Sequence, residues 1–399
     1  MTSKKLILAY SGGLDTTYCA KLLCEQGYEV HTVTVNTGGF SADELSEIEK
    51  NAYELGVARH STIDATKEFY EKCVKYLVYG NVLRNNTYPL CVSAERAFQA
   101  LEIAKFAKDA GAKYIAHGCT GAGNDQVRFD MVFSIVCPEV TIITPIRDTN
   151  VARATSKAYL KEHGIVRSWS EHEYSINKGL WGTSIGGKET LVSDQMLPEK
   201  AFAQTVQNVA PFDILLHFTK GELTGINEQT NLGAVETIRK LTEIAEPLGI
   251  GRDIHVGDTI IGLKGRVGFE APAPMIILKA HEGLEKHTLT KSQIQLKANL
   301  SLTYGAMIHE GFYLEPALRD IERFLENSQR TVTGSVRVRL APYRFQVIGV
   351  SSANDLMRKE FGVYGESNQM WTSDDAKGFT KILGNSLSMY YKVNPNEKN

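Results

Sequence analysis

The sequence lacks paired cysteines, long apolar runs and runs of basic residues. Its six cysteines form no CxxC pair and follow no His/Cys metal-ligand spacing, which argues against a disulfide framework and a structural zinc site. No segment approaches the ~20 apolar residues that span a bilayer, and the first residues lack an apolar stretch of signal-peptide length. A net charge of −2 also argues against a strong nucleic-acid surface. We therefore expect a cytoplasmic protein whose thiols are reduced.

Strand and helix patterns alternate in the first third of the chain. Short apolar runs predict buried strands at 6–10, 30–35, 114–117 and 140–144. Helical periodicity follows the first run up to Gly27, begins again at Asp43, and covers 93–110. This alternation predicts an α/β fold with a parallel sheet, helices on both faces, and ligands at the carboxyl ends of the strands.

The later part of the chain has a different texture. Residues 173–195 are rich in Ser and Gly with little periodicity, and we interpret them as a site-forming loop region. We expect a strand at 212–219, an amphipathic helix at 235–245 and a hairpin over 336–350. An apolar segment from about Asp374 ends the chain in a form suited to packing on a neighbouring subunit.

A glycine-rich loop follows the first strand directly and leads into a helix: Ser11-Gly12-Gly13-Leu14-Asp15-Thr16-Thr17. Its glycines let the backbone turn around an anion, and its hydroxyls and the helix N-terminus add donors and a favourable field. It is neither a P-loop nor GxGxxG. A turn in which Ser and Asp cap the helix explains less of the seven-residue pattern. For Asp15 alone, a Mg²⁺ ligand and a helix cap are equally supported.

A second polar motif follows the strand near 114: His117-Gly118-Cys119-Thr120-Gly121-Ala122-Gly123-Asn124-Asp125-Gln126-Val127-Arg128-Phe129. A carboxylate can receive a substrate ammonium, hydroxyl and amide groups can bind a carboxylate, and a guanidinium can bind another anion. A simple connection rarely needs all of these groups, so we predict a substrate site. We interpret Cys119 as a small residue rather than a reactive thiol.

The first loop resembles the SGGxD[ST] loop of the ATP pyrophosphatases, and the two motifs together resemble the paired signature of argininosuccinate synthases. Further similarities extend this resemblance from Lys5 to at least Gly349: Tyr174-Ser175-Ile176, Leu180-Trp181-Gly182-Thr183-Ser184, and Gly251-Arg252-Asp253 with Lys264 and Arg266. The resemblance implies three parts: an ATP pyrophosphatase-like nucleotide-binding domain (1–168), an α+β synthetase domain (169–370) and a C-terminal oligomerisation arm (371–399) in a homotetramer.

The resemblance also implies binding residues for each substrate. ATP would contact Ala9, Tyr10, Ser11, Gly12, Gly13, Leu14, Asp15, Thr16, Thr17, Val35 and Gly118. Aspartate would be held by Thr120, Asn124 and Asp125. Citrulline would be held by Tyr88, Ser93, Asn124, Arg128, Ser175 and Ser184.

The implied activity is an AMP-forming ligase reaction of arginine biosynthesis. The ureido oxygen of citrulline attacks the α-phosphate of ATP and releases pyrophosphate; the aspartate amine then displaces AMP to give argininosuccinate. Catalysis would rest on positioning and charge stabilisation, with Mg²⁺ on the phosphates and no covalent enzyme intermediate.

Four positions depart from the family pattern: Ala122 stands for Lys, Gly186 for Glu, Gly257 for Glu, and Phe269 for Tyr. The last two would contact citrulline. One interpretation is that Asp258 supplies the missing charge. The other is that the acceptor is an N-acylated citrulline, which has no ammonium to pair and needs the room that glycine leaves.

Two further alternatives belong to other classes. A tRNA-modifying ligase shares the SGGxD loop, but such an enzyme needs a basic RNA-facing surface, which the sequence does not show. A non-catalytic nucleotide-binding paralogue would need no aspartate site, so Asn124, Asp125 and Arg128 argue against it.

Overall fold

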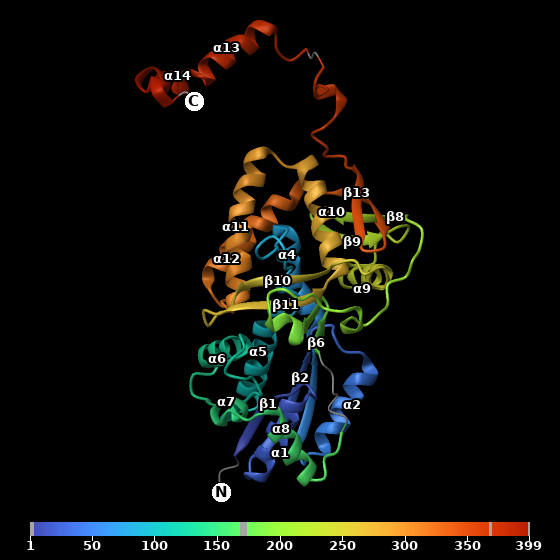
Figure 1. Ribbon diagram of the computed structural model, residues 1–399, viewed down its shortest axis with the longest axis vertical. Helices are drawn as coiled ribbons and strands as arrows, with labels where there is room; N and C mark the ends of the chain where they lie inside the picture. The colour runs from blue at the N-terminus through green and yellow to red at the C-terminus, as the bar shows by residue number, and fades with distance from the viewer. Residues whose placement is uncertain (1–3, 168–173, 367–368, 398–399) are drawn as a thin grey trace. The chain divides into compact units, whose positions relative to one another are not determined.

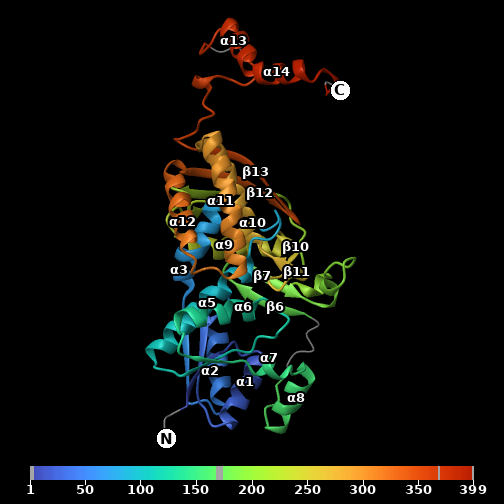
Figure 2. The same cartoon turned by 90° about the vertical axis from the view of Figure 1, so that its left-hand side faces the viewer.

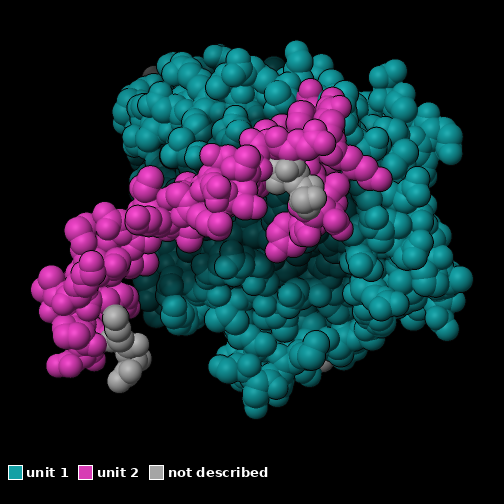
Figure 3. Space-filling model, turned by 90° about the horizontal axis from the view of Figure 1, so that it is seen from above, with its two compact units in different colours: residues 1–353 teal, residues 354–399 magenta. Residues whose placement is uncertain are grey.

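The computed structural model describes residues 4–167, 174–366 and 369–397. Two compact units, residues 1–353 and 354–399, make up the chain and are coloured separately in Figure 3. We describe each unit by itself.

A five-stranded parallel sheet organises the first part of the larger unit (Figure 1). Its strand order is β3-β2-β1-β4-β5. The strands are β1 (Lys5–Ala9), β2 (Glu29–Asn36), β3 (Arg59–Asp64), β4 (Tyr114–Ala116) and β5 (Thr141–Ile143). The helices around it are α1 (Leu14–Glu25), α2 (Ala42–Tyr53), α5 (Cys91–Asp109), α6 (Asp125–Val136), α7 (Pro145–Thr149) and α8 (Arg153–Glu162).

Alternation along β1 explains why helices cover both faces of this sheet. Leu6 and Leu8 belong to one buried cluster, which includes residues of α1, α2 and α8. Ile7 and Ala9 point to the other side and belong to a larger cluster, which includes α5 and α6. Successive side chains of a strand face opposite sides, so a strand covered on both sides is apolar throughout. The predicted α/β fold and parallel sheet are confirmed.

Two details of this region differ from expectation. Helix α2 begins after Ser41, whose hydroxyl accepts from the Glu44 backbone in a capping box, so Asp43 lies inside the first turn. The edge strand β3 was not predicted, because its burial only partly alternates and gives no continuous apolar run.

Two antiparallel sheets follow in the same unit. The first, in the order β10-β11-β7-β6, contains β6 (Ser175–Gly179), β7 (Gly182–Gly186), β10 (Arg252–Asp258) and β11 (Lys264–Glu270). The second, in the order β13-β12-β8-β9, contains β8 (Phe212–Thr219), β9 (Glu222–Ile226), β12 (Gly334–Ala341) and β13 (Arg344–Ser351). The expected strand at 212–219 and the hairpin over 336–350 are confirmed.

The interpretation of 173–195 as a loop region is wrong for its first part. Residues 175–186 form the β6–β7 hairpin, although their Gly and Ser content hides the period of two. Residue 173 itself lies outside the described residues.

Helices pack beside these sheets (Figure 2). They are α3 (Thr66–Phe69), α4 (Lys75–Gly80), α9 (Ala234–Ala245), α10 (Pro272–Thr288), α11 (Lys291–Glu310) and α12 (Pro316–Ser328). Helix α9 matches the predicted amphipathic helix, with Ile238 and Leu241 on its buried side.

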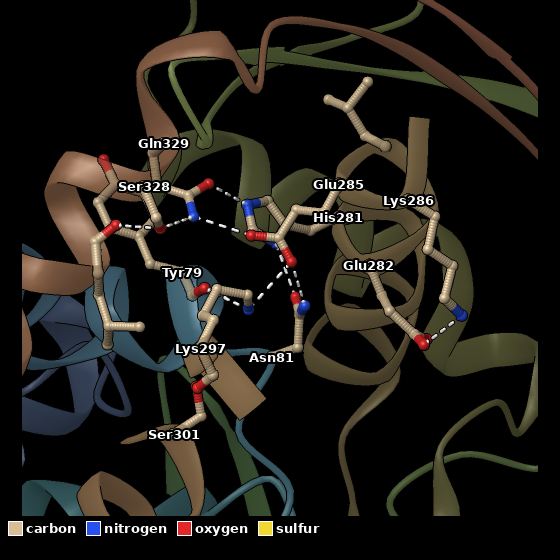
Figure 4. Close-up of polar contacts among 12 residues, drawn as sticks. Tyr79, Asn81, His281, Glu282, Glu285, Lys286, Lys297, Ser301, Ser328 and Gln329 are labelled. Carbon is tan, nitrogen blue, oxygen red and sulfur yellow. Dashed lines mark hydrogen bonds and ion pairs between the residues drawn. The ribbon is translucent and has the colours of Figure 1, made fainter. Parts of the chain in front are cut away.

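A buried polar network joins α4, α10 and α11 (Figure 4). Lys297 Nζ lies 3.0 Å from Glu285 Oε2 and donates to the Tyr79 carbonyl at 2.8 Å. The amides of Asn81 and Gln329 donate to the two oxygens of Glu285 at 2.6 and 2.8 Å. Each charged group therefore has direct partners, which offsets the cost of burial.

The smaller unit carries two helices, α13 (Ser373–Leu383) and α14 (Asn385–Val393). Neither helix has a buried residue within the described part of the unit. The expected apolar residues Phe379, Ile382, Leu383 and Leu387 are all exposed by more than 60%. Across the described residues, no helix is long and apolar enough to cross a membrane.

Candidate active site

The phosphate loop lies where β1 ends and α1 begins. Gly12 has φ +74°, a backbone conformation that L side chains rarely adopt. Helix α1 starts after Gly13, and no side chain in the described residues caps it. Its first-turn N–H groups are therefore available to an anion. Thr17 is buried and donates to the Gly12 carbonyl, whereas Ser11 is exposed.

Asp15 is not the cap of this helix. The N-cap is Gly13, and Asp15 occupies the first turn. Burial raises the pKa of the Asp15 carboxyl, and the charge of Arg153 acts in the opposite direction. The capping interpretation of Asp15 is wrong, and the role as a Mg²⁺ ligand stays a prediction.

Neighbouring strand ends bring the other nucleotide candidates to the same edge. A Cβ added to Gly118 would lie 3.2 Å from both the Asp15 carbonyl carbon and the Thr16 nitrogen. Glycine thus permits the segment after β4 to touch the start of α1. Val35 lies near the carboxyl end of β2, the neighbour of β1. The structure brings the predicted ATP residues together at the carboxyl edge, as expected for this sheet type.

A buried histidine, His117, holds the loop after β4 through hydrogen bonds. His117 Nε2 lies 2.8 Å from Asp130 Oδ1, and Arg147 binds the other oxygen of Asp130 at 2.6 Å. The Cys119 backbone N–H donates to His117 Nδ1 at 3.2 Å. Gln126 reaches back to the Gly121 carbonyl. These contacts fix the ends of the loop that carries Thr120.

The helix α6 begins within the second motif and orients its charged groups. Asp125 receives Arg128 Nη1 at 2.8 Å and Arg96 Nε at 3.2 Å. These two guanidinium groups outweigh the effect of burial and lower the pKa of Asp125. Asn124 Oδ1 accepts from the Ile260 backbone at 2.8 Å, so the β10–β11 connection contacts this motif.

The predicted acceptor residues come from three different segments. Tyr88 is buried, stacks on His255 with ring centroids 5.2 Å apart, and packs against Phe269 at 5.4 Å. Ser184 of β7 is paired with Phe269 of β11, and Ser175 of β6 is paired with Gly186.

Ser93 is the remaining predicted acceptor residue, at the start of α5. Its hydroxyl lies near Tyr88 and acts to lower the Tyr88 pKa, against the larger effect of burial. The Ser93 oxygen nevertheless makes no well-formed hydrogen bond within the described residues. A buried hydroxyl in this state is suited to receiving a ligand.

Comparison with known proteins agrees with this geometry. The argininosuccinate synthase N-terminal HUP domain matches residues 5–166, and the argininosuccinate synthase C-terminal domain matches residues 174–390. The chain belongs to the argininosuccinate synthase family.

Individual relatives match over nearly their full length. Argininosuccinate synthase of Methanocaldococcus jannaschii is 38% identical over 388 residues, covering 96% of this chain and 97% of the relative. The Xanthomonas campestris protein of the same name is 36% identical over 403 residues, covering 99% and 100%. The Pyrococcus furiosus synthase is 36% identical over 395 residues, covering 98% and 95%.

Three of the positions that depart from the expected family pattern differ in how closely they are packed: 186, 257 and 269. A Cβ at Gly186 would meet only Ser175 Cβ, at 4.0 Å, so this glycine leaves open space. Phe269 is fully buried. Asp258 does not supply the carboxylate that the resemblance implies at position 257: its side chain is 61% exposed and lies 2.6 Å from Lys264 Nζ. The interpretation that Asp258 compensates is contradicted by this geometry, because neighbouring strand residues face opposite sides.

Several buried groups of the site were missed from the sequence. Glu95 is 2% exposed, and Thr37 donates a hydrogen bond to its carboxylate. Burial raises the pKa of Glu95 to about 7, with Arg96 acting in the opposite direction. Arg96 also donates to Asn177 Oδ1 of β6 at 3.0 Å. The available signal was the pair of adjacent charged residues, Glu95 and Arg96, in the mainly apolar first part of α5.

The cysteine and metal chemistry of the site is limited. All six cysteines are free. Burial raises the pKa of the Cys119 thiol to about 12, which leaves little thiolate at neutral pH. Within the described ranges, no group of three or more His, Cys, Asp or Glu residues is arranged to hold a metal ion.

Proposed function

We propose that the chain catalyses the ATP-dependent condensation of citrulline with aspartate, forming argininosuccinate, AMP and pyrophosphate in arginine biosynthesis. The observation that carries this proposal is the match of both synthase domains across 5–166 and 174–390. The uncapped phosphate loop at the carboxyl edge of the parallel sheet supports the ATP-binding part.

In this proposal the phosphate loop binds ATP. The residues from Ala9 to Thr17, with Val35 and Gly118, surround the nucleotide, and backbone N–H groups at the start of α1 bind its phosphates. Asp15, a half-buried carboxylate in the first turn of α1, would hold Mg²⁺, which would supply charge neutralisation on the phosphates.

The second motif then holds the two amino acids. Thr120, Asn124 and Asp125 bind aspartate and present its amine. The ion pairs of Asp125 with Arg96 and Arg128 keep the carboxylate charged and fixed, so that it can receive an ammonium group without reorganisation.

Citrulline is bound by groups from the facing segments. These groups are Tyr88, Ser93, Asn124, Arg128, Ser175 and Ser184. The positioned ureido oxygen attacks the α-phosphorus of ATP, the bond to the β-phosphate breaks and pyrophosphate leaves, giving a citrullyl-adenylate. The aspartate amine then attacks the activated ureido carbon and AMP leaves. The protein supplies orientation and charge stabilisation, and no side chain is needed as a nucleophile.

The decisive test is aspartate-dependent pyrophosphate release, with argininosuccinate identified by mass spectrometry. We expect release only when ATP, Mg²⁺, citrulline and aspartate are all present. Thr16→Ala in the phosphate loop should raise the KM for ATP. ATP binding without any pyrophosphate release would contradict the proposal and favour a non-catalytic paralogue.

We further propose a homotetramer assembled through the C-terminal arm, residues 371–399, with a nucleotide-binding domain at 1–168 and a synthetase domain at 169–370. Support comes from the apolar side chains that α13 and α14 leave exposed. In light scattering, Leu383→Asp with Leu387→Asp should reduce the molecular mass of the particle. An unchanged mass would exclude this role for the arm. A cytoplasmic location also remains a prediction.

A further inference from the structure

The acceptor end of the site contains Gly257, at a position where the resemblance to the synthase family implies a carboxylate. A Cβ added to Gly257 would lie 2.5 Å from His255 Nε2 and 3.4 Å from Asn85 Nδ2. The His255 ring therefore occupies the space into which a side chain at 257 would extend. Asp258, the next residue, is exposed and paired with Lys264, so it supplies no negative charge to this end of the site.

Two buried histidines at this place have unused ring nitrogens. His255 is 5% exposed and His309 is 7% exposed. His255 Nδ1 and both ring nitrogens of His309 make no hydrogen bond within the described residues. Buried polar atoms are nearly always paired in a folded protein, so three unpaired nitrogens in one cluster point to a missing ligand.

Two arginines surround the histidines. Arg128 donates from Nε and Nη2 to the His309 carbonyl at 3.0 and 2.6 Å. Arg84 reaches the Asp258 carbonyl at 3.5 Å, and its Nε is buried without a partner. The loop that carries Arg84 leads directly to Tyr88, which stacks on His255. All four side chains thus belong to the acceptor end of the site.

The electrostatic environment of this cluster is positive. Burial, then Arg128, Arg84 and His255, lowers the pKa of His309 to about 3. The Asp258 backbone, near the ring but without a well-formed hydrogen bond, acts weakly in the opposite direction. Burial and Arg84 also lower the His255 pKa. Such surroundings disfavour a buried ammonium and favour a carboxylate that can accept from guanidinium and imidazole donors.

We propose that this cluster of Arg84, His255 and His309 is a carboxylate subsite, and that the preferred acceptor is a citrulline whose α-nitrogen carries an acyl group ending in a free carboxylate. Acylation removes the ammonium, which the positive surroundings of this cluster disfavour. The terminal carboxylate supplies the charge that the cluster lacks. This inference rests on the proposed ligase activity and specifies its acceptor.

The test compares citrulline, N-acetylcitrulline and N-succinylcitrulline as acceptors in aspartate-dependent pyrophosphate release. We expect kcat/KM for N-succinylcitrulline to exceed both others by about tenfold or more, as for loss of one charge-assisted hydrogen bond. Arg84→Gln should remove most of the advantage over N-acetylcitrulline. His309→Asn should act in the same direction. The matched control is Asp258→Asn, at an exposed residue of the strand that carries His255. It should leave kcat/KM unchanged for all three acceptors.

The outcomes separate the acceptor from the ligase reaction itself. Equal or better turnover of citrulline or N-acetylcitrulline would overturn the carboxylate subsite and leave the ligase activity standing. Absence of pyrophosphate release with all three acceptors would overturn the ligase activity. In that case calorimetry decides the subsite: binding of N-succinylcitrulline that Arg84→Gln weakens supports it, and no binding overturns it.

Discussion

The buried ion pair between Lys297 and Glu285 should contribute far more to stability than the surface pair beside it. The two side chains are 4% and 3% exposed and lie 3.0 Å apart (Figure 4). Lys297→Met leaves a buried carboxylate without its counter-ion and the Tyr79 carbonyl without its donor. Loss of one partner from such a pair costs about 3–5 kcal/mol. Because Asn81 and Gln329 still donate to Glu285, we expect about 3 kcal/mol.

A matched control lies on α10, the helix that carries Glu285. Lys286 pairs with Glu282, but the two side chains are 57% and 34% exposed. Lys286→Met should therefore cost no more than about 1 kcal/mol.

Urea unfolding followed by circular dichroism measures both variants. A double variant, Lys297→Met with Glu285→Gln, should recover part of the loss, because no unpaired charge remains. If Lys297→Met lowered the unfolding free energy no more than Lys286→Met, the argument from burial would be refuted.

Three other predictions concern the active site. Gly118→Ala should raise the KM for ATP about tenfold, because the new Cβ would lie 3.2 Å from backbone atoms of the phosphate loop. Gly121→Ala is the control: its Cβ would meet only Arg147 Cγ at 3.6 Å, so the KM for ATP should change little. Glu95 has its pKa raised from 4.5 to about 7, so the folded state binds more protons than the unfolded state in that window and its stability falls as pH rises through it. Relative to the natural protein, Glu95→Gln should therefore gain unfolding free energy between pH 5 and pH 7, by about 3 kcal/mol or less; a difference independent of pH would contradict this assignment. Cys119→Ser should keep full activity, and the native thiol should react slowly with iodoacetamide at neutral pH.

The sequence was sufficient for the features that depend on local pattern. Apolar runs at 6–10 and 30–35 predicted β1 and β2, and their alternation with helices predicted the parallel sheet. The phosphate loop was placed correctly between a strand and a helix, because its glycines and hydroxyls stand at fixed spacing. The hairpin over 336–350 was predicted because apolar and charged residues alternate along its first strand, which leaves one face exposed to solvent.

The local sequence pattern did not predict features that depend on contacts between residues or on where a helix begins. The β6–β7 hairpin was missed, since its stability comes from pairing with β11 rather than from its own Gly and Ser residues. The role of Asp15 as a cap was wrong, because capping depends on the residue where the helix begins and that residue is Gly13.

The sequence by itself determined the family and the nucleotide loop, and its resemblance to the family predicted a missing carboxylate at Gly257. Only the tertiary structure decided which groups surround this glycine. Asp258 is adjacent in sequence but lies on the other side of its strand, whereas Arg84, His255 and His309 come from separate segments and meet beside Gly257. The charge of a site is a sum over neighbours in space, and chain folding, not sequence order, selects those neighbours.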